Sequence, residues 1–107
     1  MTNKPGITKL LTPKELSHFN LLFSAIKGLK VVTFLYRDDD EIQESLRKVE
    51  PFLIGDRNES KITNLCGWCL NVKKRNSNNP MSWRIYELEK INGLQILDES
   101  FLPQIRK

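Results

Sequence analysis

The stretch Val31-Val32-Thr33-Phe34-Leu35-Tyr36 combines β-branched and aromatic residues, and the polar run Arg37-Asp38-Asp39-Asp40-Glu41 follows it directly. This pattern is typical of a β-strand that ends in a turn. Four similar stretches follow, and we expect them to be strands over residues 45–54, 61–72, 82–88 and 94–97. Pro51 marks an edge or a bend in the first of these. Five short strands in succession predict a meander that curls into a small β-barrel.

The residues before these strands predict one helix. Thr12-Pro13-Lys14-Glu15 has the form of a capping box, with Thr12 as the N-cap and Glu15 reaching back to it. Apolar residues then recur at helical spacing, and Gly28 supplies a stop, so we expect a helix over residues 13–27. A single helix cannot form a core alone and must pack on the strands. The expected fold class is therefore mainly β, of the α+β type.

The length of 107 residues, 39% of them hydrophobic, predicts one domain with a modest core. We expect this domain to span residues 12–102, with the helix over 13–27 and the barrel over 29–102. Residues 1–11 and 103–107 are expected to be flexible ends. No stretch approaches the roughly 18 to 20 apolar residues of a membrane helix, and the start has no apolar signal segment. We therefore expect a cytoplasmic protein without a membrane partner.

Residue types that carry catalysis are sparse. The chain has two cysteines and one histidine, too few for a disulfide scaffold or a zinc site within one chain. Cys66 and Cys69 form a C-x-x-C, but a strand places these positions on opposite faces, so we interpret both as packing residues. The acidic run 38–41 lacks the spacing of a calcium loop and is interpreted as a solvated turn. We find no Gly-rich phosphate loop, and we expect no enzyme activity, no cofactor and no metal.

The formal net charge of +4 is unevenly distributed. Residues 1–30 and 61–107 are basic and residues 31–60 are acidic, which favours an anionic partner on one face. Basic and aromatic residues stand together on the predicted strands: Arg47, Lys48, Trp68, Trp83, Arg84 and Tyr86. Such side chains can stack on bases and pair with phosphates. The alternative is that the aromatic residues belong to the core, and both interpretations stay open at this point.

The order of motifs in the strand block resembles the WYL domain of bacterial and phage regulators. The matching motifs are Arg47-x-Val49-x-Pro51 and Arg84-x-Tyr86-x-Leu88-x-x-Ile91, within a resemblance that covers residues 25–101. The tripeptide that names the family is not intact, because either Trp68-Cys69-Leu70 or Thr63-Asn64-Leu65 occupies its place. We favour the second alignment, in which Thr63-Asn64-Leu65 takes the place of the tripeptide. In this alignment Gly67-Trp68 matches the small residue and the aromatic residue that follow the tripeptide in the family.

The resemblance implies an SH3- or Sm-like β-barrel with a helix packed across it. It also implies a regulatory, ligand-sensing module whose basic groove binds a nucleotide or single-stranded nucleic acid. The site residues that it carries over are Tyr36, Arg47, Trp68, Arg84, Tyr86 and Lys90. Arg47 and Arg84 would pair with phosphates, and Tyr86 or Trp68 would stack on a base. Only one helix precedes the strands, so we do not expect this module to read duplex DNA by itself.

Two other functions compete with this one. A small barrel can present an edge strand or an apolar groove to a regulator protein or to a second copy of itself, which would make the chain an interaction or homodimerisation module. A thiol-based redox protein is the third hypothesis, and it requires a low thiol pKa at Cys66.

Overall fold

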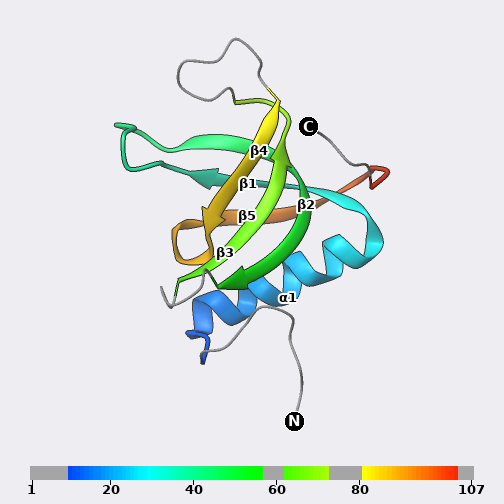
Figure 1. Ribbon diagram of the computed structural model, residues 1–107, viewed down its shortest axis with the longest axis horizontal. Coiled ribbons are helices and arrows are strands. Elements are labelled where there is room, and N and C mark those ends of the chain that lie inside the picture. The colour runs from blue at the N-terminus through cyan, green and yellow to red at the C-terminus, as the bar shows by residue number, and fades with distance from the viewer. Residues whose placement is uncertain (1–9, 57–61, 73–80, 104–107) are drawn as a thin grey trace.

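The computed structural model describes residues 10–56, 62–72 and 81–103, whose arrangement is shown in Figure 1. Residues 1–9 and 104–107, the larger parts of the two expected flexible ends, lie outside the described residues. The elements confirm a mainly β fold with one α-helix. In chain order they are α1 (Pro13–Gly28), β1 (Lys30–Tyr36), β2 (Ser45–Asp56), β3 (Thr63–Cys69), β4 (Ser82–Glu87), the short 3-10 helix η1 (Leu88–Lys90) and β5 (Asn92–Ser100).

Helix α1 begins where the capping box predicts. Thr12 Oγ1 accepts a hydrogen bond from the Glu15 N–H at 3.1 Å, and Glu15 Oε1 accepts one from the Thr12 N–H at 3.0 Å. The helix ends at Gly28, but Leu29 is the residue that adopts the left-handed conformation, with φ 56°. The Leu29 carbonyl then accepts a hydrogen bond from the Phe101 N–H, which ties the helix end to the chain after β5. None of the helices in the described ranges has the length and apolar character that a membrane span needs.

The five strands form one antiparallel sheet in the order β4-β3-β2-β1-β5 (Figure 1). The sheet is curved but open, because within the described residues the edge strands β4 and β5 do not pair. The predicted closed barrel is therefore wrong. Strand β4 ends at Glu87, and the three residues of η1 lead into β5, which pairs with β1 at the other edge of the sheet and has no ladder with β4 in the described residues.

Strand β2 is an interior strand that bends at Pro51. Its register with β3 shifts between Pro51 and Leu53, so the residue that lacks an N–H stands at an irregularity in the ladder. The sequence predicts either a sheet edge or a bend at Pro51, and the structure confirms the bend. Pro51 lies opposite Gly67, and β2 approaches so closely that a Cβ at position 67 would lie 2.5 Å from Val49 Cγ1 and 3.0 Å from the Glu50 carbonyl oxygen. The close pairing of β2 and β3 therefore requires glycine at this position.

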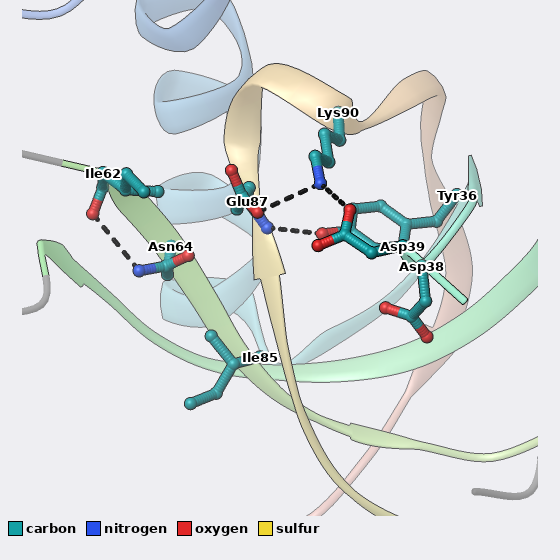
Figure 2. Close-up of a pocket in the computed structure, with 8 residues that line it drawn as sticks. All are labelled: Tyr36, Asp38, Asp39, Ile62, Asn64, Ile85, Glu87 and Lys90. Carbon is teal, nitrogen blue, oxygen red and sulfur yellow. Dashed lines mark hydrogen bonds and ion pairs between the residues drawn. The ribbon is translucent and has the colours of Figure 1, made fainter. Parts of the chain in front are cut away.

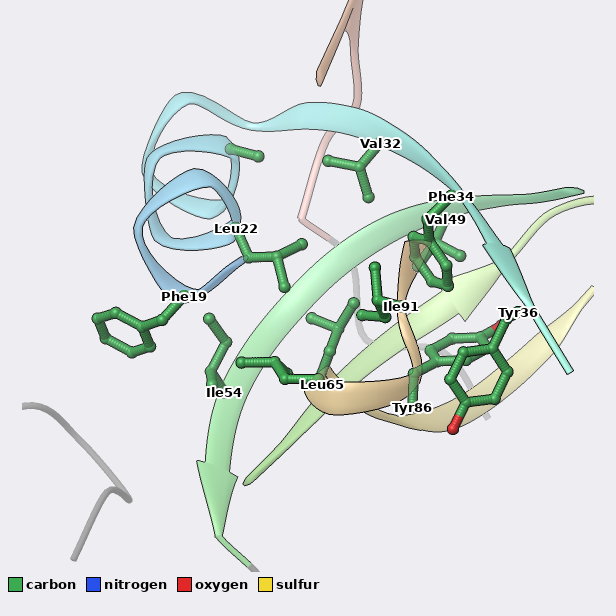
Figure 3. Packing of buried hydrophobic residues seen from close by; sticks show 12 residues of the cluster. Phe19, Leu22, Val32, Phe34, Tyr36, Val49, Ile54, Leu65, Tyr86 and Ile91 are labelled. Atoms are coloured by element: carbon green, nitrogen blue, oxygen red, sulfur yellow. The ribbon is translucent and has the colours of Figure 1, made fainter. Parts of the chain in front are cut away.

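One face of the sheet, called the inner face below, packs with α1 to form the core (Figure 3). Helix α1 covers one end of this face through Phe19 and Leu22. The other end is filled by Phe34, Tyr36 and Tyr86, whose rings meet edge to face with centroids 4.9 to 6.1 Å apart. The opposite side of the sheet, called the outer face, carries Phe52, Cys66, Trp68, Trp83 and Ile85.

Candidate functional site

Five of the six predicted site residues cluster at the end of the inner face that lies away from α1, beside the loop that joins β1 to β2. The loop carries the run Asp38–Glu41, called the acidic loop below. Long-range pairing of the strands brings these residues together, although they are spread over 55 positions of the sequence. They are Tyr36 of β1, Arg47 of β2, Arg84 and Tyr86 of β4, and Lys90 of η1.

Arg47 is completely buried. Its Nη2 donates to Glu41 Oε1 at 2.5 Å, its Nε donates to Ser45 Oγ at 3.1 Å, and the guanidinium lies 5.8 Å from the centroid of the Tyr36 ring. Within the described residues Nη1 has no hydrogen-bond acceptor and makes only a longer ion pair with Asp38 Oδ2 at 3.8 Å. A buried donor without an acceptor is costly, so this end of Arg47 has capacity for a further oxygen ligand.

Arg84 reaches the same aspartate from β4. Its Nη2 donates to Asp38 Oδ2 at 2.6 Å and its Nη1 donates to the Val72 carbonyl at 3.4 Å, while 12% of the side chain is exposed. One carboxylate oxygen therefore lies 2.6 Å from one guanidinium nitrogen and 3.8 Å from another. Two guanidinium groups around one oxygen atom form an arrangement that suits a phosphate oxygen as well as a carboxylate.

A cavity of about 180 Å³ opens beside the acidic loop (Figure 2). Lys90 Nζ stands at its rim, 2.7 Å from Asp39 Oδ1 and 3.2 Å from Glu87 Oε2. The hydrogen bond to Asp39, followed by that to Glu87, raises the pKa of Lys90, and the same bond to Lys90 lowers the pKa of Asp39. Both groups are therefore charged at neutral pH. The lining residues are Tyr36, Asp38, Asp39, Ile62, Asn64, Ile85, Glu87 and Lys90.

The two tyrosines belong to the core. Tyr86 is fully buried, Tyr36 is almost fully buried, and their rings meet edge to face at 4.9 Å. The Tyr36 hydroxyl also accepts a hydrogen bond from the Glu87 N–H at 2.9 Å. Burial raises the pKa of both phenols. Tyr86 has no exposed ring face on which a base could stack in this structure.

Trp68 lies on the outer face, away from the arginines. Gly67 and Arg84 are paired in the ladder between β3 and β4, and so are their neighbours Trp68 and Trp83. Successive side chains alternate between faces, so the two tryptophans point away from Arg84. Their rings meet edge to face at 5.3 Å, and Phe52 contacts Trp83 at 5.4 Å. Trp68 is therefore not part of the cluster at the acidic loop.

The acidic loop is the part of this cluster that the sequence analysis missed. As a solvated turn its carboxylates would face water, but the Asp38 and Glu41 side chains are only about one third exposed (31% and 32%), and each bonds an arginine. A usable signal was present in the sequence. Glu41 is the last residue of the predicted turn run and Arg47 is the third residue of the predicted strand after it, so the return of the chain can bring their opposite charges into contact.

The two cysteines lie on opposite faces of β3, as the alternation of side chains predicts. Cys66 is half-buried and lines a second cavity together with Leu53 and Ile85, whereas Cys69 is fully buried. Burial raises the pKa of the Cys66 thiol, which reduces the reactive thiolate fraction and argues against the redox hypothesis. In the described part of the chain, no three His, Cys, Asp or Glu residues are grouped so that they could hold a metal ion.

No protein-family model matches this chain, and no curated protein matches its sequence. The fold does have a counterpart among solved structures. This structure is similar to a segment of PafBC. The match is to proteasome accessory factor B/C of Arthrobacter aurescens, with a TM-score of 0.68 and 13% sequence identity, and it covers 86% of this chain and 13% of that chain. The likeness is one of fold, and this chain spans only a small part of the PafBC chain.

Proposed function

We propose that this chain is a regulatory binding module for a phosphate-bearing ligand, a nucleotide or a single-stranded nucleic acid, which binds at Arg47, Arg84 and Lys90. The observation that carries the proposal is the place of Asp38 Oδ2 between the two guanidinium groups. A phosphate oxygen uses the same charged donors at similar distances. Nη1 of Arg47 has no hydrogen-bond acceptor in the described residues, and a ligand with several oxygens would satisfy it.

The surroundings of the cluster support the same class of ligand. The cavity beside Lys90 gives the sugar or base of a nucleotide a place next to its phosphate, and Tyr36 is the aromatic residue at its wall. The net charge of +4 favours an anionic partner. The regulatory part of the proposal rests on the resemblance of the strand motifs to the WYL domain of bacterial and phage regulators.

An NMR titration of the full chain tests this proposal in two arms. One arm uses a short single-stranded DNA of mixed sequence and the other uses a mononucleotide, each at two salt concentrations. We expect amide shifts at Asp38, Arg84 and Lys90, with an affinity that falls as salt rises. Shifts with the mononucleotide would identify a nucleotide module, whereas shifts with the DNA alone would identify a nucleic-acid module. A folded chain that is silent in both arms at millimolar ligand would overturn the proposal.

A matched pair of variants locates the site. Arg84→Gln removes one charge from the cluster and should weaken binding about tenfold, which corresponds to about 1.4 kcal/mol. Lys30→Gln removes the same charge at the opposite end of β1, where Lys30 pairs with Asp98, and should change the affinity less than about twofold. Equal losses in the two variants would show attraction by net charge without a defined site.

A second function, protein interaction or homodimerisation, is favoured by the outer face. Phe52, Leu53 and Ile85 are each about half exposed (51%, 48% and 50%). The Phe52 ring contacts Trp83, and Leu53 and Ile85 line one cavity. Apolar residues that gather on one face of a small domain often mark an interface. Sedimentation velocity at several concentrations tests the homodimer. A dimer that resists salt and is lost in Phe52→Ser would support it, and a monomer at every concentration would rule it out.

A further inference from the structure

We propose that the acidic loop is a built-in competitor for the ligand site: it occupies the position of the ligand's phosphates and must leave the arginines when the ligand binds. This inference rests on the proposed function and adds its regulation. It starts from one observation, that every cationic side chain predicted to bind the ligand is bonded to this single loop. Asp38 holds Arg84, Asp39 holds Lys90 and Glu41 holds Arg47.

The loop is arranged to present its carboxylates to these cations. The Asp38 N–H donates to Glu41 Oε1 at 2.7 Å, and the Glu41 N–H donates to the Asp38 carbonyl at 3.0 Å, which closes a tight turn. Arg37 Nη1 donates to the Glu41 carbonyl at 2.6 Å and braces the turn from outside. The turn thus presents the Glu41 carboxylate to Arg47 and the Asp38 carboxylate to Arg84.

The loop fills this place incompletely. Glu41 takes Nη2 of Arg47, but Nη1 of the same buried guanidinium has no hydrogen-bond acceptor within the described residues. A tetrahedral phosphate offers more oxygens than the single Asp38 oxygen that lies between the arginines, so it can satisfy both guanidinium groups. A ligand therefore gains a hydrogen bond that the acidic loop does not make.

The loop is also free to move at a small packing cost. Asp39 and Ile42 project into solvent, with 89% of the Asp39 side chain and 95% of Ile42 exposed. Within the described residues, the buried core cluster contains no residue from the loop between Tyr36 and Ser45. Opening the loop would break ion pairs and turn hydrogen bonds but would expose little apolar surface, which is typical of segments that open locally.

Two substitutions in the loop test the competition, with the mixed-sequence single-stranded DNA as the probe. Asp38→Asn removes the carboxylate between the arginines and should tighten binding about fivefold. Asp39→Asn removes one of the two carboxylates bonded to Lys90, the other being that of Glu87, and should tighten binding about twofold. The Asp39 variant also keeps the test available if Asp38→Asn fails to fold, because Asp39 is exposed. Asp98→Asn is the matched control, since it removes the same charge beside Lys30, far from the cluster.

Hydrogen exchange gives an independent readout on the unmodified chain. A ligand usually protects the amides that it covers, but a displaced loop loses its own hydrogen bonds. We therefore expect the Asp38 and Glu41 amides, which are bonded within the loop, to exchange faster when the DNA is bound. Slower exchange at both amides would show that the loop stays closed and would overturn the competition.

The outcomes separate this inference from the proposed function. Tighter binding in both loop variants, with no change in Asp98→Asn, supports the competitor. Equal tightening in Asp98→Asn overturns it in favour of a general charge effect. If the loop variants bind no better than the unmodified chain while Arg84→Gln still weakens binding, the competitor is wrong and the ligand site stands. If folded chains with and without the loop substitutions all fail to bind, both proposals are overturned.

Discussion

Arg84 donates a 2.6 Å hydrogen bond to Asp38, which lies 46 positions earlier in the chain. The bond joins the edge strand β4 to the loop after β1, although two strands separate β4 from β1 in the sheet. This hydrogen bond therefore crosses the inner face of the sheet and does not join two strands that are paired with each other. Because it spans the curve of the sheet, this bond contributes to the shape of the fold as well as to the candidate site.

Removal of Arg47 should destabilise the fold more than removal of Arg84. Arg47→Ala leaves a cavity in the core and frees Glu41 from its partner, so we expect a loss of about 3 kcal/mol in the free energy of unfolding. Arg84→Ala should cost about 1 to 2 kcal/mol, since its side chain is partly exposed. Urea unfolding measures both values.

Lys48→Ala is the control for these two variants. Lys48 is the next residue on β2, and its ion pair with Glu99 is largely exposed, so its loss should cost no more than about 0.5 kcal/mol. A loss in Lys48→Ala as large as that in Arg47→Ala would contradict the assignment of Arg47 to the buried cluster.

Gly67→Ala should destabilise the chain by about 2 kcal/mol. The added methyl group would meet Val49 at 2.5 Å and the backbone of Glu50 at 3.0 Å, so β2 and β3 would have to separate. Gly28→Ala is the matched control, because its methyl group would meet only Lys30 Cγ at an ordinary 3.6 Å. Alanine is also the better helix former there, so thermal melting should show a neutral or slightly stabilising effect. Equal melting temperatures for both variants would contradict the close approach.

The two tyrosines should resist alkaline titration. Burial raises the pKa of Tyr36 and of Tyr86 above the usual 10.0, whereas both phenols titrate near that value in the unfolded chain. The contribution of the two tyrosines to stability is therefore constant below about pH 10 and falls as pH rises through this range, because the unfolded state releases the protons more readily. Near-ultraviolet absorbance should show less tyrosinate at pH 10 in the folded chain than in the unfolded chain. A normal titration curve in a chain that circular dichroism shows to be folded would contradict the burial of both rings.

Thr12→Ala should lower the free energy of unfolding by about 1 kcal/mol. Its hydroxyl accepts from the Glu15 N–H and also donates to Glu89 at 2.8 Å, so the variant loses both the helix cap and a link to η1. Ser17→Ala, on the exposed side of α1, is the control and should be neutral or slightly stabilising. Chemical unfolding of the two variants under the same conditions makes the comparison, and equal effects would contradict the capping role.

Much of the fold is local in origin and could be predicted. The capping box at Thr12 and the β-branched run Val31–Tyr36 depend on neighbours in the sequence, and both elements form where these patterns predict them. Closure of the sheet depends on how two edges meet in space. The sequence contains turn signals after β4, but no local pattern shows that η1 carries the chain across to β1 in place of a hairpin.

The candidate site was predictable only in part. Arg47 lies two residues before Val49 and Arg84 two residues before Tyr86, so the period of two places each arginine on the same face as a core residue, and the structure brings the two arginines together. The alternation also separates Trp68 from Arg84 once the register of β3 and β4 is known, and that register is not visible in one sequence. Asp38 contacts Arg84, which is 46 positions away in the chain and at the other end of four adjacent strands. No residue near Asp38 in the sequence therefore indicates that its carboxylate binds this arginine.

The strand order also constrains how the fold is reached in time. Strand β1 pairs with β2, its neighbour in the chain, and with β5, where Lys30 lies opposite Ser100. During synthesis from the N-terminus, β1 and β2 are complete long before β5 exists. The second edge of β1 must therefore stay without its partner until almost the whole described chain has been made. Because pairings between such distant segments slow folding, formation of the β1–β5 ladder should be a late step.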